Sequence, residues 1–136
     1  MHLVAHFEKL GGTACYAPYI EGYFTTLMKK TPGDATRFKF RIDTGADVTC
    51  VPSKYVDGSP LFGKPILVRG HDGHIVRARR HLGIVSIETP DGVVSVRPEA
   101  GVLLTGSEIG LLGMDILKNL HLEMRDQKLT LSSEDL

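Results

Sequence analysis

One carboxylate in this chain stands where a residue that does acid–base chemistry is expected. Residues 38–42 (FKFRI) alternate apolar with basic side chains and are followed by Asp43, Thr44, Gly45 and Ala46. The alternation predicts a strand with one buried face, and the glycine beside a hydroxyl residue predicts a tight turn at its end. A carboxylate held between buried strands is partly desolvated, which disfavours its charged form and often marks a functional acid. Asp43 is therefore the candidate catalytic group.

Two segments together resemble the signatures of the retropepsin-like (retroviral-type) aspartic proteases. The first is 40–49 (FRIDTGADVT), and the second is 109–117 (IGLLGMDIL), in which apolar residues precede a glycine and a short helix. The resemblance implies an all-β, retropepsin-like acid-protease fold of short antiparallel strands, with a flap hairpin and one short C-terminal helix. A single such domain is expected over residues 1–136, with its core at about 19–131.

Peptide hydrolysis in this family requires two carboxylates. One is ionised and takes a proton from water, while the other is protonated and polarises the scissile carbonyl. This chain has one Asp-Thr-Gly, and its Asp115 follows Gly113 at a predicted helix start, where an aspartate commonly caps free N–H groups. The resemblance therefore implies an aspartic endopeptidase that acts on a peptide or protein substrate as a homodimer, with one Asp43 from each chain.

The resemblance also implies roles for the neighbours of Asp43. Thr44 would join the two loops across the dimer, Gly45 would present its carbonyl to the substrate, and Asp47 would bind substrate main chain. Ala46 would support the loop without the hydroxyl that a serine offers there.

A hairpin with an Asp-Gly turn is predicted over residues 65–78. It stands where the family has the flap that closes over the bound peptide, although a plain surface hairpin has the same pattern. The flap interpretation adds the substrate-binding candidates Gly70, His71, Asp72, Gly73 and His74.

Two departures from the family pattern leave other functions open. Met114 stands where many retroviral members have an arginine that pairs with the acid at the position of Asp47, and the flap tip is charged and rich in histidine. A catalytically silent dimerisation or peptide-binding module is the alternative, and a structural β-domain with a coincidental Asp-Thr-Gly is a third hypothesis. The candidates for sealing a dimer are segments 1–7 and 129–136.

The remaining periodicity predicts an antiparallel β-domain and argues against a parallel α/β sheet, because no long helices separate the strands. A turn is predicted at 31–34, a turn or single helical turn at 53–58, and a short helix at 114–120. Strands are predicted at 2–9, 19–25, 37–42, 82–87, 93–96, 100–104, 121–124 and 128–131.

The composition argues against several other functions. Sixteen basic and sixteen acidic residues give a formal net charge of zero, so neither nucleic acid nor an anionic membrane is the expected partner. No apolar run approaches the roughly 18 residues of a membrane span, and no secretory signal is recognisable. Cys15 and Cys50 are interpreted as reduced thiols of a cytoplasmic protein. The six histidines have no matching Cys or His pair, so no metal or other cofactor is expected.

Overall fold

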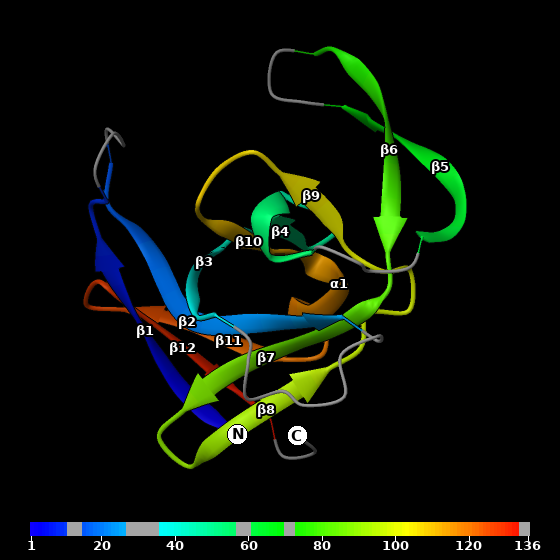
Figure 1. Cartoon of the computed structure of the whole chain (residues 1–136). Helices are drawn as coiled ribbons and strands as arrows, with labels where there is room; N and C mark the ends of the chain where they lie inside the picture. Colours follow the sequence, from blue (N-terminus) through cyan, green and yellow to red (C-terminus); the bar gives the residue numbers. More distant parts are fainter. Residues whose placement is uncertain (11–14, 27–35, 57–60, 70–72, 134–136) are drawn as a thin grey trace.

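The computed structural model describes residues 1–10, 15–26, 36–56, 61–69 and 73–133, and strands dominate them (Figure 1). The strands are β1 (His2–Glu8), β2 (Ala17–Thr26), β3 (Phe38–Ile42), β4 (Cys50–Pro52), β5 (Leu61–Arg69), β6 (Ile75–His81), β7 (Gly83–Thr89), β8 (Gly92–Val96), β9 (Leu103–Thr105), β10 (Gly110–Leu112), β11 (His121–Arg125) and β12 (Lys128–Ser132). A 3-10 turn at Ser53–Tyr55 and the short helix α1 (Met114–Leu117) complete the described elements. None of the described helices is long and apolar enough to cross a membrane.

The all-β prediction is confirmed, with small shifts at element ends. The strand expected at 100–104 begins only at Leu103, because Gly101 has φ of +74° and Val102 forms an isolated bridge to His81. The helix expected over 114–120 ends at Leu117, and Leu120 donates its N–H to a carbonyl three residues back, as in a tighter turn. The turn expected at 31–34 lies outside the described residues.

Strand β2 is the centre of the main sheet because it pairs with three strands. Its beginning pairs with β1, its middle with β3 and its end with β7, all antiparallel. The sheet continues in the order β11-β12-β1-β2-β3-β10-β4-β9, and β8 joins through β7. The β5–β6 hairpin forms a separate two-stranded sheet, which projects at the upper right of Figure 1. The hairpin predicted over 65–78 is therefore confirmed, with longer arms.

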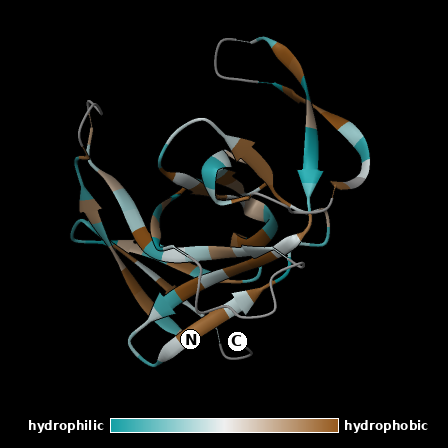
Figure 2. Ribbon diagram, in the orientation of Figure 1, coloured by the Kyte–Doolittle hydropathy of each residue, from teal (hydrophilic) through white to brown (hydrophobic). Residues whose placement is uncertain are grey.

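The hydrophobic core lies where β3, β10 and α1 meet. Phe38, Phe40 and Ile42 are buried on one face of β3, as the alternation predicted, and Leu112 and Ile116 are buried with them. Figure 2 shows hydrophobic residues recurring along the strands and the helix that meet at this centre. Burial of such side chains contributes about 1.5–3 kcal/mol each, so the strand that precedes Asp43 is firmly anchored.

Candidate active site

The turn with Asp43 is built across the end of β10. Strand β10 lies between β3, to which it is parallel, and β4, to which it is antiparallel. Residues 43–49 connect β3 to β4 and therefore have to pass over the end of β10. The N–H of Asp43 donates to the carbonyl of Leu112 at 3.0 Å, which continues the β3–β10 ladder to the turn itself.

Hydrogen bonds within the turn fix the Asp43 carboxylate. The N–H of Gly45 donates to Oδ1 of Asp43 at 2.9 Å, and the N–H of Ala46 donates to the carbonyl of Asp43 at 3.2 Å. A Cβ at position 45 would lie 3.2 Å from Oδ1, so glycine gives this contact its room. The carboxylate is thus held in one orientation by its own turn.

The turn with Asp43 is only partly covered in the single chain. Asp43 is half-buried, and Thr44 and Gly45 are exposed, because the turn projects beyond the strands that precede and follow it. Within the described residues, the hydroxyl of Thr44 makes no hydrogen bond. The open side of Asp43 is therefore free to meet a ligand or a second chain.

The second motif supports the turn through its backbone. The N–H of Met114 donates to the carbonyl of Ala46 at 2.7 Å, and the N–H of Asp115 donates to the carbonyl of Asp47 at 3.2 Å. Gly113 packs so closely that a Cβ there would lie 2.8 Å from the carbonyl carbon of Val48. The first N–H groups of α1, which have no partner inside the helix, thus hold residues 46 and 47.

The Asp115 carboxylate is held by three hydrogen bonds beside the turn. Its Oδ1 accepts hydrogen bonds from the Thr49 hydroxyl at 2.7 Å and from the Ile116 N–H at 2.9 Å, and its Oδ2 accepts the Thr49 N–H at 3.0 Å. The prediction that Asp115 caps the start of the helix is wrong by two positions. The N-cap is Gly113, and Asp115 lies in the first turn. The interpretation that it does not act in catalysis agrees with these contacts.

Sequence reasoning missed two residues next to the turn. Thr49 is fully buried, and no local signal distinguishes it from the other threonines. Cys50 has a pKa raised from 9.0 to about 11, first by burial and then by the negative charges of Asp115 and Asp43. Both cysteines are free thiols, as predicted, and Cys15 is exposed.

The structure says less about the other predicted site residues. Asp47 is exposed, and its carboxylate makes no hydrogen bond or ion pair within the described part of the chain. Gly73 has φ of +82° and His74 is exposed, whereas Gly70, His71 and Asp72 lie outside the described residues. No described contact joins the hairpin tip to Asp43, so the flap role remains a prediction.

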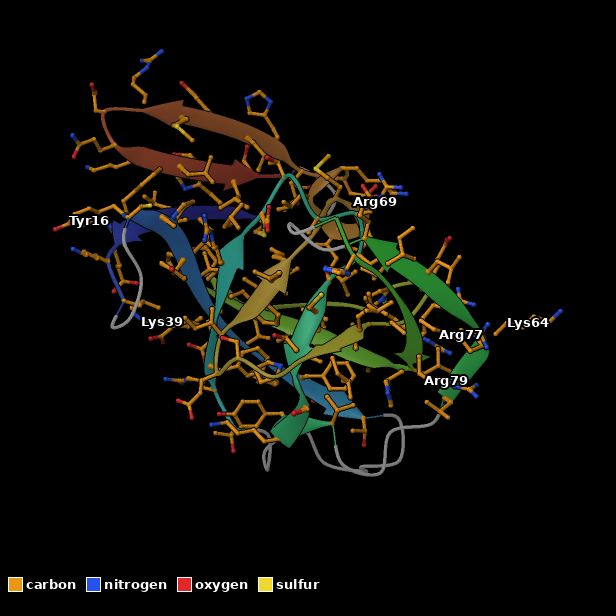
Figure 3. All side chains as sticks on the ribbon, turned by 90° about the horizontal axis from the view of Figure 1, so that it is seen from above. Tyr16, Lys39, Lys64, Arg69, Arg77 and Arg79 are labelled. Carbon is orange, nitrogen blue, oxygen red and sulfur yellow. The ribbon has the colours of Figure 1, made fainter. Side chains whose placement is uncertain are left out.

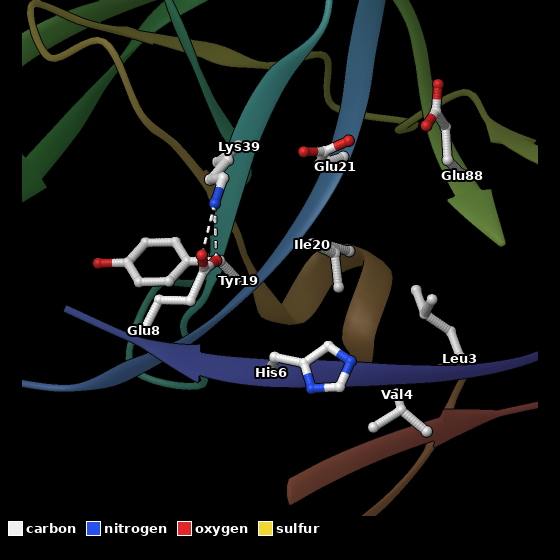
Figure 4. Close-up of a pocket in the computed structure, with 9 residues that line it drawn as sticks. All are labelled: Leu3, Val4, His6, Glu8, Tyr19, Ile20, Glu21, Lys39 and Glu88. Atoms are coloured by element: carbon white, nitrogen blue, oxygen red, sulfur yellow. Dashed lines mark hydrogen bonds and ion pairs between the residues drawn. The ribbon is translucent and has the colours of Figure 1, made fainter. Parts of the chain in front are cut away.

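A hollow in the described part of the chain lies away from Asp43. It has a volume of about 430 Å³ over β1, β2 and β3, and Lys39 bonds both carboxylate oxygens of Glu8 there at 2.7 and 2.8 Å (Figure 4). None of its lining residues belongs to the Asp43 turn or to the hairpin. Among the described residues, no group of three or more His, Cys, Asp or Glu side chains is placed to hold a metal ion.

Comparison with known proteins places the fold. No family model matches the sequence, and no curated protein sequence matches it. Among solved structures, the chain is similar to a retropepsin-like aspartic protease from Rickettsia conorii, with 16% identity and a TM-score of 0.55. The match covers 96% of this chain and 89% of that chain. The fold is retropepsin-like.

The retropepsin-like fold accounts for how the two sequence signatures come together. Asp43 and Gly113 lie at corresponding ends of the parallel strands β3 and β10, so their loops meet although they are far apart in sequence. The predicted fold class is therefore confirmed. The roles of the individual site residues stay predictions, because they concern a substrate and a second chain.

Proposed function

We propose that this protein is an aspartic endopeptidase that acts as a homodimer and cleaves extended peptide segments. The observation that carries the proposal is the Asp43 carboxylate, which is fixed by the N–H of Gly45 and open on its other side. The chain has one Asp-Thr-Gly, and Asp115 is engaged by Thr49 and Ile116. A second catalytic carboxylate therefore has to come from another chain.

In the proposed mechanism, the two Asp43 carboxyl groups share one proton. Two such groups in contact cannot both ionise easily, so one is charged and one is neutral, and the pair titrates as a unit. The ionised group takes a proton from a water molecule, and the water oxygen attacks the scissile carbonyl carbon. The neutral group gives its proton to the carbonyl oxygen. The tetrahedral intermediate then collapses with proton transfer to the amide nitrogen and breakage of the C–N bond.

Substrate binding follows from the elements around this pair. An extended peptide lying over the turn would bond the Gly45 carbonyl and the exposed Asp47, and the β5–β6 hairpin would close over it. Main-chain bonds of this kind give affinity, while side-chain pockets on alternate sides give selectivity.

Met114 supports a second candidate function, a silent dimerisation or peptide-binding module. Its side chain packs against the core, and Asp47 has no ion-pair partner within the described residues. The ion pair that the family resemblance leads one to expect at this place is missing from the described contacts. Such a module would bind peptides through the same surface but would release them intact.

Cleavage of a defined peptide mixture, followed by mass spectrometry at pH 4 to 8, distinguishes the two functions. The wild-type chain is compared with Asp43→Asn, which keeps the shape of the side chain, and with Asp91→Asn, which changes an exposed acid on another turn. A protease requires cleavage that Asp43→Asn abolishes and Asp91→Asn preserves. Intact peptides with all three proteins, together with peptide binding by each, would contradict the protease function and support the binding module.

A further inference from the structure

The two terminal strands pair with each other within the chain. Strand β1 lies between β12 and β2, and β12 lies between β11 and β1. The terminal amino group of Met1 donates to the carbonyl of Ser133 at 2.6 Å, and the N–H of Ser133 donates to the carbonyl of Met1 at 2.9 Å. Strand β12 is bonded on both sides over its whole length, so a partner could pair with it only by separating strands that are already bonded. Strand β1 pairs with β12 over residues 2–6 and with β2 over residues 6–8, so among the described strands residues 2–5 are paired on one side only.

Strand β11 is the free edge at this end of the sheet. Among the described strands it pairs with β12 alone. Its outer side therefore presents backbone N–H and C=O groups that can bond another strand.

An apolar row crosses the sheet and ends uncovered on β11. Ala5, Leu129 and Met124 lie side by side on neighbouring strands, because Ala5 is opposite Leu129 and Leu129 is opposite Met124. Ala5 is 0% exposed and Leu129 is 5% exposed, but Met124 is 67% exposed. On this face of the sheet, the side chains that β1 and β12 contribute to the row are therefore buried, and the side chain of β11 is exposed. One more strand beside β11 would place its own side chain next to Met124 on this face and bury part of the methionine.

The charges of β11 are complementary to a second copy in one antiparallel register. With a twofold axis at Met124, the two methionines face each other, and Glu123 of each copy faces Arg125 of the other. With the axis one residue earlier, Glu123 would face itself, which is unfavourable for like charges directly opposite. Within one chain, Arg125 Nη2 lies 3.4 Å from Glu123 Oε1, with both side chains exposed, and such a pair is weak.

In the view of Figure 3, the free edge and the turn that follows β3 lie towards the same side of the molecule. In Figure 3, the β11–β12 hairpin runs along the upper side with β11 outermost, and the teal turn that leaves β3 reaches the same side. We infer that a second copy of this chain pairs antiparallel along β11, with the twofold axis at Met124. This inference rests on the proposed function in one respect, namely that a complete active site needs two chains.

Charge reversals on β11 test this interface without any assay of cleavage. In Glu123→Arg homodimers the introduced arginine would face Arg125 of the other copy, and in Arg125→Glu homodimers the introduced glutamate would face Glu123. The dissociation constant of each variant's homodimer should be about tenfold or more above that of the wild type, because two attractive cross-strand pairs become repulsive. An equal mixture should recover dimers of one chain of each kind, in which both cross-strand pairs are attractive again. The recovery can come only from across the interface, since each variant keeps its own like-charged pair within the chain.

Subunit mass by analytical ultracentrifugation over a range of concentrations is the readout. Arg97→Glu, a reversal at an exposed site beyond the end of β8, is the matched control and should leave the dimer unchanged. Recovery in the mixture also shows that both variants are folded. A wild-type chain that stays monomeric, single variants that dimerise like the wild type, or a mixture without recovery would each overturn the β11 interface.

The outcomes separate this inference from the proposed function. Dimers of the Asp43→Asn protein should respond to the β11 reversals as those of the wild type do, because Asp43 lies outside β11. Dimers that respond to the β11 reversals but never cleave would leave the interface standing and overturn the protease. Cleavage by a dimer whose dissociation constant the reversals leave unchanged would leave the protease standing and overturn the β11 interface.

Discussion

The hydroxyl of Thr49 lies 2.7 Å from Oδ1 of Asp115 and joins the two sequence signatures. The Thr49 hydroxyl oxygen also accepts the N–H of Gly113 at 3.1 Å. A single buried hydroxyl therefore connects the loop that follows Asp43 to the start of α1. This connection keeps the turn in place while its other side stays open to solvent.

Thr49→Val should lower the free energy of unfolding by about 1–3 kcal/mol, because it leaves the Gly113 N–H and part of the Asp115 carboxylate without a partner. Valine has nearly the same shape as threonine, so the change removes little else. Urea unfolding at pH 7 measures the loss.

Thr25→Val is the matched control for this change. Thr25 is also buried, but within the described residues its hydroxyl has no hydrogen-bond partner. Removing it should leave the stability unchanged or raise it, since burial of an unpaired hydroxyl is unfavourable. Equal losses in the two variants would show that the hydrogen bonds of Thr49 contribute nothing specific.

Gly113→Ala should destabilise the chain by about 1–3 kcal/mol, because a Cβ at this position would overlap backbone atoms that cannot swing away. It would lie 2.9 Å from the carbonyl oxygen of Ala46 and 2.9 Å from that of Val48. Gly106→Ala is the control, since nothing lies within 4 Å of a Cβ there. A thermal unfolding scan should show a lower midpoint for the first variant alone. Unchanged midpoints for both would mean that the loop and the helix start are not in tight contact.

Cys50 should react slowly with iodoacetamide at pH 8. Its pKa of about 11, against an ordinary 9.0, leaves about a hundredfold less thiolate than in an ordinary thiol. The Cys15→Ser variant makes Cys50 the sole thiol, and the rate is compared in folded and urea-unfolded protein. The stability that the protonated thiol contributes is present below pH 9 and is lost as the pH rises towards 11. Equal rates at pH 8 in folded and unfolded protein would contradict the raised pKa.

The sequence was informative where a signal is local. The alternation of residues 38–42 predicted both the strand and its buried face, and the Asp-Thr-Gly predicted the turn that ends it. Asp126 and Gln127 lie with positive φ between β11 and β12, at the predicted connection. In each case the backbone conformation is set by neighbouring residues, so a pattern of a few letters suffices.

Features that depend on distant contacts could not be predicted in the same way. The pairing of β1 with β12 joins residues from opposite ends of the chain. The contact of Thr49 with Asp115 spans 66 positions, and neither residue type marks it. The extent to which Asp43 is buried likewise depends on what covers the turn in three dimensions, which no short sequence pattern specifies. Met124 belongs to this group as well, because its strand is short and its partner row becomes visible only in the folded sheet.

The central claim is that one active site uses Asp43 from two chains. The most direct test mixes wild-type and Asp43→Asn chains at constant total concentration, allows the subunits to exchange, and measures the initial cleavage rate against the wild-type fraction. If both carboxylates are needed, mixed dimers are inactive, and an equal mixture keeps about a quarter of the wild-type rate because random pairing leaves about a quarter of the dimers intact. A rate that falls in simple proportion, to about one half in the equal mixture, would contradict the claim.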